Sequence, residues 1–270
     1  MCLLVVLAQE RPELPLVVAA NRDELFERPA IPMTVLRERR PRILGGRDTL
    51  AGGTWLAVNE AGVVAGLTNC PATKDPERRS RGELPIALAR YTSAPAAVDA
   101  FASTFRPADY NPAWLLVGDR ASAFAIDMTG DDAPTVRELP PGTHVLENRP
   151  LGASSPKVNH VLKMVEQLDG FGDGALVSGL QRILSDHEVP PGLAAAEEAG
   201  IDKIPPEVKA ACVHTERYGT RWSGVVTLPA DRHREPTVLF ADGPACRGPW
   251  QDARLLWAAR RTKARGRSLP

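Results

Sequence analysis

Two short apolar runs near the start of the chain constrain the fold more than any other feature of the sequence. Residues 2–8 and 15–20 are continuous apolar runs, and residues 9–14 between them have the length of a hairpin connection. Runs of this length bounded by turn residues are typical of buried strands. The sequence therefore predicts an antiparallel hairpin whose first strand begins inside the fold, at residue 2.

The rest of the chain alternates groups of strands with pairs of helices. Further strands are expected over residues 54–58, 62–68, 114–118, 122–128, 144–146, 211–214, 224–228 and 237–240. Helices are expected over residues 83–91, 95–105, 155–168 and 175–184, and loops over 28–43, 45–48 and 190–206. Ser155 is the expected N-cap of the third helix, with Pro156 in its first turn. Because most neighbouring strands are linked by hairpins, the pattern predicts an α+β fold of antiparallel sheets with helices layered outside.

Composition and charge indicate an ordinary globular protein. The chain has 270 residues, of which 43% are hydrophobic, and its 33 basic and 33 acidic residues give a formal net charge of +0. This balance argues against nucleic-acid binding and against a membrane-surface role driven by total charge. No apolar run approaches the ~20 residues of a membrane span, and no basic leader precedes residue 2. We expect one cytoplasmic domain over residues 1–270, with a basic C-terminal tail from about residue 258.

The cysteines and histidines show no spacing typical of a metal site. The cysteines are Cys2, Cys70, Cys212 and Cys246, and no two of them form a Cys-x-x-Cys pair. The histidines, at positions 144, 160, 187, 214 and 233, form no close pair with ligand spacing. The sequence therefore predicts no metal and no structural zinc, and in the cytoplasm it predicts reduced thiols.

Cys2 is the sharpest chemical feature. Removal of Met1 would leave a free α-amine a few bonds from the Cys2 thiol, and the reference pKa of an α-amine is about 7.7–8.0. Such an amine can act as the general base for its own side chain, as it does for N-terminal threonine nucleophiles. The alternative is that Cys2 is a small packing residue at the edge of the first strand.

Arg22 and Asp23 follow the second apolar run directly. In a hairpin the end of the second strand faces the start of the first, so both side chains are expected close to Cys2. There an arginine can stabilise a thiolate, and a carboxylate can hold and orient the α-ammonium group. The alternative is that the two residues form an ion pair or a turn that caps the hairpin.

Two asparagines and a late arginine complete the candidate site. Asn69 and Asn148 each follow a short apolar strand, and an asparagine amide can donate to an oxyanion without titrating. Arg221 precedes the strand expected over residues 224–228 and could bind a carboxylate or the thiolate side of the site. The alternatives are turn asparagines and an ordinary surface arginine.

Several motifs together resemble the NRDE family, which includes the transport and Golgi organisation protein 2 homologues. The motifs that carry the resemblance run in order to about residue 250: Met1-Cys2, Ala20-Asn21-Arg22-Asp23-Glu24, Arg28-Pro29, Gly52-Gly53-Thr54-Trp55-Leu56, Leu67-Thr68-Asn69, Arg81-Gly82-Glu83-Leu84 and Tyr218-Gly219-Thr220-Arg221.

That family in turn resembles the N-terminal nucleophile hydrolases of the choloylglycine hydrolase and penicillin V acylase type. This second resemblance implies a four-layer αββα sandwich with Cys2 as nucleophile, Asn69 and Asn148 at the oxyanion and Arg221 as the late active-site arginine. The acylases place their early arginine and aspartate further apart than the adjacent Arg22 and Asp23 of this chain.

The sequence is compatible with three functions. The first is an amidohydrolase that cleaves a non-peptide C–N bond in a small acylated amide, without a cofactor. The second is a non-catalytic protein on the same scaffold that binds or traffics haem or a lipid-like ligand. The third is a domain in which the motifs are only structural.

Overall fold

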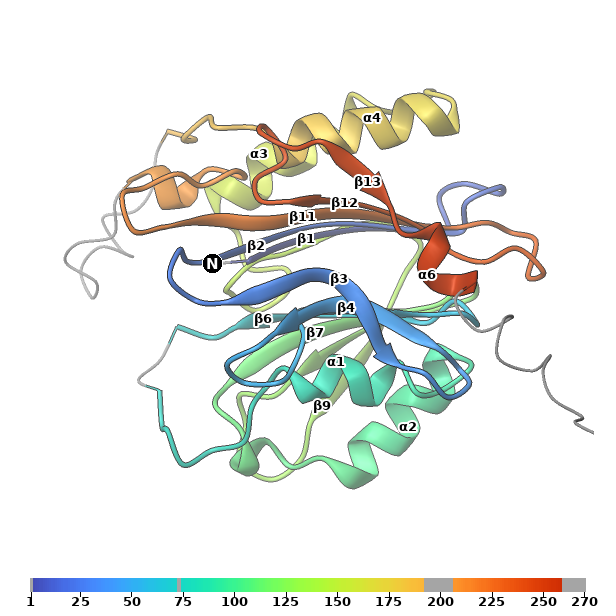
Figure 1. Cartoon of the computed structure of the whole chain (residues 1–270), viewed down its shortest axis with the longest axis vertical. Helices are drawn as coiled ribbons and strands as arrows, with labels where there is room; N and C mark the ends of the chain where they lie inside the picture. Colours follow the sequence, from blue (N-terminus) through green and yellow to red (C-terminus); the bar gives the residue numbers. More distant parts are fainter. Residues whose placement is uncertain (1, 72–73, 192–205, 259–270) are drawn as a thin grey trace, which may run out of the picture.

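The two N-terminal apolar runs form the predicted antiparallel hairpin. The computed structural model of the protein describes residues 2–71, 74–191 and 206–258 (Figure 1). In it β1 (Cys2–Ala8) pairs with β2 (Leu16–Leu25), and the register sets Cys2 opposite Arg22. β2 is longer than predicted and includes the polar residues 21–24, because these residues also pair with a third strand on the other side.

The hairpin lies inside a six-stranded antiparallel sheet. Among the described residues the strand order is β10-β1-β2-β11-β12-β13. The other strands of this sheet are β10 (Gly142–Leu146), β11 (Tyr218–Leu228), β12 (Thr237–Asp242) and β13 (Trp250–Asp252). β11 begins six residues before the predicted strand, and the strand expected over 211–214 is reduced to a single bridge between His214 and Gly219.

The second sheet has seven antiparallel strands in sequence order, again counting only the described residues. They are β3 (Ala30–Arg37), β4 (Ile43–Asp48), β5 (Leu56–Asn59), β6 (Val64–Asn69), β7 (Ala113–Gly118), β8 (Ala123–Asp127) and β9 (Thr135–Leu139). The predicted loops over 28–43 and 45–48 were therefore wrong. Gly46 lies in β4 because the Trp55 ring occupies the place of its missing Cβ, and β3 is an edge strand, where Pro32 is tolerated.

Helices cover the outer face of each sheet. They are α1 (Glu83–Leu88), α2 (Ala94–Thr104), α3 (Pro156–Glu166) and α4 (Asp173–Leu184). The short α6 (Arg254–Ala258) instead packs its Trp257 against the core between the sheets. Ser155 caps α3 as predicted, since its side chain accepts a hydrogen bond from the Val158 amide. Figure 1 shows α3 and α4 above the first sheet and α1 and α2 below the second.

The alternation of β1 shows how the layers are held together. Leu4 and Val6 enter the core between the two sheets, whereas Leu3, Val5 and Leu7 enter the core under α3 and α4. A third core joins the second sheet to α1 and α2. The predicted four-layer αββα sandwich is thus confirmed.

Two other expectations concern parts of the chain that are only partly described. The basic tail falls on residues 259–270 and most of the 190–206 loop falls on 192–205, which lie outside the described residues. In the described part of the chain, no helix combines the length and the hydropathy that a membrane span needs.

Candidate functional site

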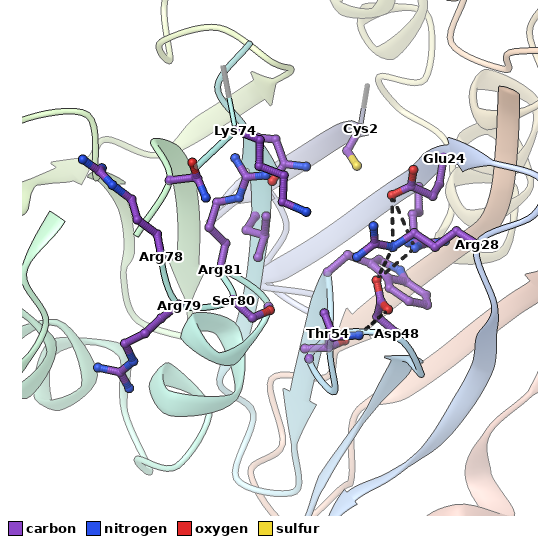
Figure 2. Close-up of a pocket in the computed structure, with 18 of the residues that line it drawn as sticks. Cys2, Glu24, Arg28, Asp48, Thr54, Lys74, Arg78, Arg79, Ser80 and Arg81 are labelled. Atoms are coloured by element: carbon purple, nitrogen blue, oxygen red, sulfur yellow. Dashed lines mark hydrogen bonds and ion pairs between the residues drawn. The ribbon is translucent and has the colours of Figure 1, made fainter. Parts of the chain in front are cut away.

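Cys2 lies where two cavities meet. A cleft of about 330 Å³ and a second cavity of about 240 Å³ share four lining residues, which are Cys2, Asp23, Glu24 and Asn69. The cleft extends toward the loop before α1, and Figure 2 shows Lys74 and Arg81 on one side of it and Glu24, Arg28 and Asp48 on the other. Asn148 and Tyr218 line the second cavity but not the cleft. A group bound at the Cys2 thiol would therefore have space on both sides.

Asn148 and Asn69 join Cys2 through a chain of hydrogen bonds. The backbone N–H of Cys2 donates to Oδ1 of Asn148 over 2.7 Å, and Nδ2 of Asn148 donates to the backbone carbonyl of Asn69. These residues meet because β10 pairs with β1, and because Thr68 at the end of β6 donates to the Glu147 carbonyl over 2.8 Å. Asn148 thus contacts the backbone nitrogen of Cys2, and one N–H of its amide is already in use.

The electrostatic environment of Cys2 favours the neutral thiol. Burial raises the pKa of the Cys2 thiol, and the Asp23 carboxylate acts in the same direction. The backbone N–H of Asp23 and the Arg22 guanidinium oppose the rise without cancelling it. Because only the thiolate is a strong nucleophile, this thiol needs a base that removes its proton.

Asp23 is buried with half of its carboxylate in use. Its Oδ1 accepts a hydrogen bond from Thr220 Oγ1 over 2.6 Å, whereas its buried Oδ2 has no hydrogen-bond partner among the described residues. Burial raises the pKa of Asp23, and the buried Lys157 ammonium and the Thr220 hydroxyl limit the rise. Oδ2 is therefore an acceptor that could take a donor not yet present.

Arg22 faces the cleft from the centre of a polar cluster. Its Nη2 lies 3.4 Å from Asp48 Oδ2 and 3.6 Å from Glu24 Oε2, and its guanidinium carbon lies 4.6 Å from the centre of the Trp55 ring. Burial lowers the pKa of Arg22, although it remains a cation near neutral pH. The predicted proximity of Arg22 to Cys2 is confirmed by the strand register.

Asp48 anchors the other end of this cluster. It accepts from Arg28 Nε over 2.6 Å and from the backbone N–H groups of Leu50 and Ala51 over 3.0 Å each. Burial works against the charged form, but the Ala51 amide and the Arg28 guanidinium hold the pKa of Asp48 below its usual value. Asp48 thus remains ionised and positions both arginines.

The structure does not bring Arg221 to the cavities that Cys2 lines. Its Nη1 donates to the backbone carbonyls of Leu25, Phe26 and Arg28, which fixes the turn after β2. The cause is a register shift in β11 between Thr220 and Trp222, which leaves Arg221 unpaired with β2. The residues of this strand that reach the site are Tyr218, which lines the second cavity, and Thr220, which donates to Asp23.

Arg81 and Lys74 were not singled out from the sequence. Arg81 donates to the Pro112 carbonyl over 2.9 Å, and neither cation has a carboxylate partner among the described residues. Burial lowers the pKa of Arg81, and the nearby Cys2 and Cys70 thiols oppose the fall. In the sequence, the only feature that pointed to Arg81 was the motif Arg81-Gly82-Glu83-Leu84.

Two glycines place Arg81 at the cleft. A Cβ on Gly53 would lie 2.5 Å from the backbone of Gly82, and a Cβ on Gly82 would lie 2.9 Å from the Cα of Gly53. The Thr54 amide donates to the Gly82 carbonyl across this contact over 2.8 Å. The Gly52-Gly53-Thr54 and Arg81-Gly82 motifs are therefore two sides of one close backbone approach.

A solved structure supports the fold independently. The Caenorhabditis elegans ortholog of N-acylethanolamine-hydrolyzing acid amidase superposes with a TM-score of 0.55 over 87% of this chain and 98% of that chain. The two sequences are 14% identical, so this likeness extends to the fold alone.

Sequence comparison identifies the family. The pattern of the family described as Transport and Golgi organisation 2 matches residues 1–237. The Transport and Golgi organization protein 2 homolog of Bos taurus is 31% identical over 251 residues, which are 84% of this chain and 88% of that protein. The Mus musculus homolog is 27% identical over 238 residues, or 81% of this chain and 83% of that protein. This chain therefore belongs to the Transport and Golgi organisation 2 family.

Proposed function

We propose that this protein is an N-terminal cysteine amidohydrolase that cleaves a small acylated amide carrying an anionic group. The observation that supports it most is the position of Cys2 at the junction of two cavities, with its backbone nitrogen 2.7 Å from Asn148 Oδ1. After removal of Met1 that nitrogen becomes an α-amine beside a thiol of raised pKa. Asn148 Oδ1 then orients the amine, and Oδ2 of Asp23, which has no partner among the described residues, is available for its protonated form.

The proposed reaction has two halves. The α-amine takes the proton of the Cys2 thiol while sulfur attacks the amide carbonyl, which forms a C–S bond and an oxyanion. Collapse breaks the C–N bond, and the α-ammonium returns its proton to the leaving amine. Water then attacks the thioester with the α-amine as base, which releases the acid and the thiol. Asn69 and the second N–H of Asn148 are the proposed oxyanion donors.

The charge of the cleft supports an anionic substrate. Arg81 and Lys74 line it without a carboxylate partner among the described residues, whereas Arg22 and Arg28 are already paired with Asp48. Arginine binds a carboxylate or phosphate through paired hydrogen bonds. A carboxylate on the acyl or amine portion of the substrate would complete this part of the cleft.

The first experiment tests the nucleophile. Untagged protein is treated with a trace of iodoacetamide, and mass spectrometry reports both the removal of Met1 and the labelling of each cysteine. We expect Met1 to be absent and Cys2 to react much faster than Cys70. If Met1 is retained, or Cys2 is no more reactive than Cys70, the proposed mechanism is wrong.

The second experiment tests turnover and charge selectivity. A panel of acyl amides is assayed in pairs that differ only by a carboxylate or its methyl ester. Cys2→Ala should abolish turnover, and Arg81→Met should raise KM for the carboxylate member with little effect on the ester. Arg254→Met, which alters an exposed arginine paired with Asp252, is the matched control. Full turnover by Cys2→Ala would refute the proposal.

Ligand carriage without turnover is the second candidate. The same unpaired cations would bind the carboxylates of haem or the headgroup of a lipid-like ligand, and the curated relatives are named for transport. A saturable spectral change on haem titration that persists in Cys2→Ala, with no turnover of any acyl amide, would favour carriage. Absence of that change would count against haem.

A further inference from the structure

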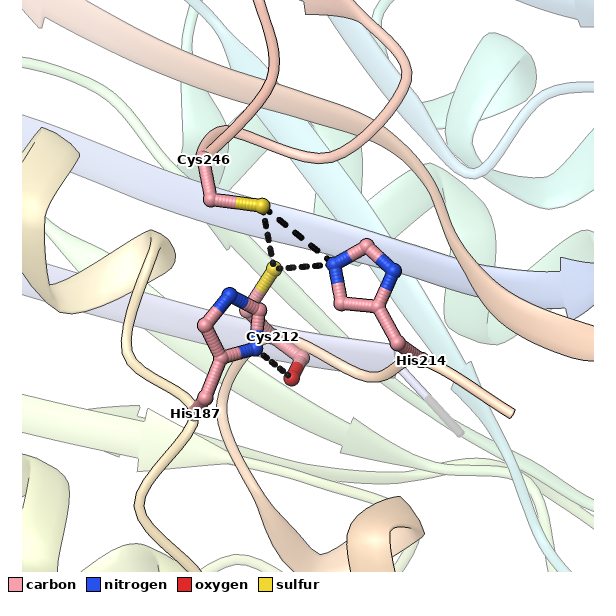
Figure 3. A group of neighbouring side chains, drawn as sticks. All are labelled: His187, Cys212, His214 and Cys246. Carbon is pink, nitrogen blue, oxygen red and sulfur yellow. Dashed lines mark hydrogen bonds between the residues drawn. The ribbon is translucent and has the colours of Figure 1, made fainter.

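Four potential metal ligands converge beside the start of β11, outside the linings of the two cavities at Cys2. They are His187, Cys212, His214 and Cys246, and their ligand atoms all lie within 4.8 Å of one another (Figure 3). His214 Nε2 lies 3.7 Å from Cys212 Sγ and 3.3 Å from Cys246 Sγ, and the two sulfur atoms are 3.9 Å apart. The rings of His187 and His214 are 4.8 Å apart between centroids.

We propose that these four side chains bind one zinc ion in a closed, tetrahedral structural site. Tetrahedral zinc with bonds of about 2.3 Å to sulfur and about 2.05 Å to nitrogen requires S–S separations of about 3.8 Å and S–N separations of about 3.6 Å. The observed separations of 3.9, 3.7 and 3.3 Å surround these values. Four protein ligands leave no open position, which is typical of structural rather than catalytic zinc.

A hydrogen bond to the Cys212 carbonyl orients the His187 ring. His187 Nδ1 lies 3.0 Å from the Cys212 carbonyl, so this nitrogen carries the proton and Nε2 keeps its lone pair for the metal.

A buried asparagine gathers the three segments that carry the ligands. Asn21 Nδ2 donates to the carbonyl of Leu184 over 2.9 Å and to that of Ala211 over 2.8 Å. Ser223 Oγ donates to Asn21 Oδ1 over 2.7 Å and accepts from the Ala245 amide over 3.0 Å. The ligands His187, Cys212 and Cys246 follow Leu184, Ala211 and Ala245 by one to three residues. The site is thus built by the fold and does not depend on a single loop.

A disulfide between Cys212 and Cys246 is the competing use of these thiols. It would explain the two sulfur atoms but not the convergence of His187 and His214 on them. The sequence expectation of no metal rested on the absence of a close Cys or His pair. Ligands at positions 187, 212, 214 and 246 meet only through β11, the end of α4 and the turn after β12, which spacing rules do not detect.

The zinc site also borders the wall of the Cys2 site. Between two of the ligands, Val213 exchanges hydrogen bonds with Thr220, whose hydroxyl donates to Asp23. The ion would therefore hold the segment that supports Thr220, without contact with substrate. The proposal does not rest on the proposed hydrolase activity.

The metal is tested on the full-length protein, expressed without a metal-binding tag in medium that contains zinc and purified without chelators. Elemental analysis should find one zinc per chain. After removal of zinc under reducing conditions, titration with Co²⁺ should give the strong visible bands of a tetrahedral ion and a thiolate-to-cobalt charge-transfer band. This spectrum requires no variant, so it decides the matter even if a ligand substitution prevents folding.

Matched variants locate the ion. Cys246→Ser and His214→Gln should lose zinc and the charge-transfer band or weaken both severely. Cys70→Ser and His233→Gln, a cysteine and a histidine outside the cluster, should retain them. Folded wild-type protein with free thiols and no stoichiometric zinc would overturn the proposal. So would a weak octahedral Co²⁺ spectrum, or a native Cys212–Cys246 disulfide detected by mass spectrometry.

Discussion

Replacement of Asn21 by alanine is the most direct test of how the fold positions its candidate sites. Asn21 is 1% exposed and makes three hydrogen bonds, two to the carbonyls of Leu184 and Ala211 and one with the Ser223 hydroxyl. An alanine at this position can replace none of these bonds, and Ser223 keeps only the bond from the Ala245 amide. The substitution therefore removes bonds and also leaves buried polar groups unsatisfied.

The expected loss follows from these three bonds. A net hydrogen bond contributes about 1 kcal/mol, and a buried group left without a partner costs about 1–3 kcal/mol, so we expect Asn21→Ala to lose about 3–5 kcal/mol of unfolding free energy. At an m-value of about 3 kcal/mol/M in urea, the midpoint falls by about 1–1.7 M. This loss is a large part of the free energy of unfolding of a typical domain, which is only about 5–15 kcal/mol.

Urea unfolding followed by tryptophan fluorescence measures this loss, since Trp55 and Trp222 are buried between the sheets. Wild type and variant are compared at the same metal content, so that ligand binding does not enter the difference. Asn159→Ala is the matched control, because Asn159 is exposed and its side chain donates one bond of 3.3 Å to Ser154. It should change stability by about 0.5 kcal/mol or less. A loss below about 1 kcal/mol for Asn21→Ala would refute the reasoning.

Two further substitutions test the cleft. Gly53→Ala brings a Cβ to 2.5 Å from the Gly82 backbone and should lower stability by about 1–3 kcal/mol, whereas Gly174→Ala, with nothing within 4 Å, should be neutral or stabilising in thermal unfolding. Equal thermal unfolding midpoints for Gly53→Ala and Gly174→Ala would show that the close backbone approach of Gly53 and Gly82 does not affect stability. Asp48→Asn should lower the unfolding free energy most at neutral pH. The pKa of Asp48 is depressed in the folded protein, so its carboxylate stabilises the fold fully only above the unfolded pKa of about 3.9. This stabilisation is lost as the pH falls through the folded pKa. A difference between wild type and Asp48→Asn that is the same at pH values well above and below this range would contradict that account.

Local patterns were sufficient for the hairpin and for the register that sets Cys2 opposite Arg22. The two apolar runs alternate between two cores, and a slip of one residue would turn every side chain of β1 to the wrong face. The register is therefore fixed by the same residues that were visible in the sequence. Proximity of Cys2 and Arg22 followed from strand geometry, whereas their chemical roles remain predictions.

Tertiary contacts decided the elements that the sequence missed. Glycine and proline were taken as loop residues over 28–48, yet Gly46 lies in a strand because the Trp55 ring fills the space beside it. Arg221 was expected at the site because of its place in a motif. A register shift in β11, which local sequence does not specify, turned its guanidinium to the carbonyls after β2. Both predictions failed because they depend on tertiary contacts that the local sequence does not specify.

Side chains alternate between the two faces of β2, which explains how the four consecutive polar residues 21–24 can contribute to both candidate sites. Val18 and Ala20 face the core between the sheets, so Arg22 continues that face and meets Trp55 and Asp48. Val17 and Ala19 face the helices, so Asn21 continues the other face and meets the end of α4. One strand therefore places Arg22 in the cleft with one face and supports the segments that carry the Cys and His ligands with Asn21 on the other, where Asp23 also lies beside Cys2. A change that shifts β2 along its neighbours should disturb both sites together, whereas Asp48→Asn should leave the Cys and His ligands in place.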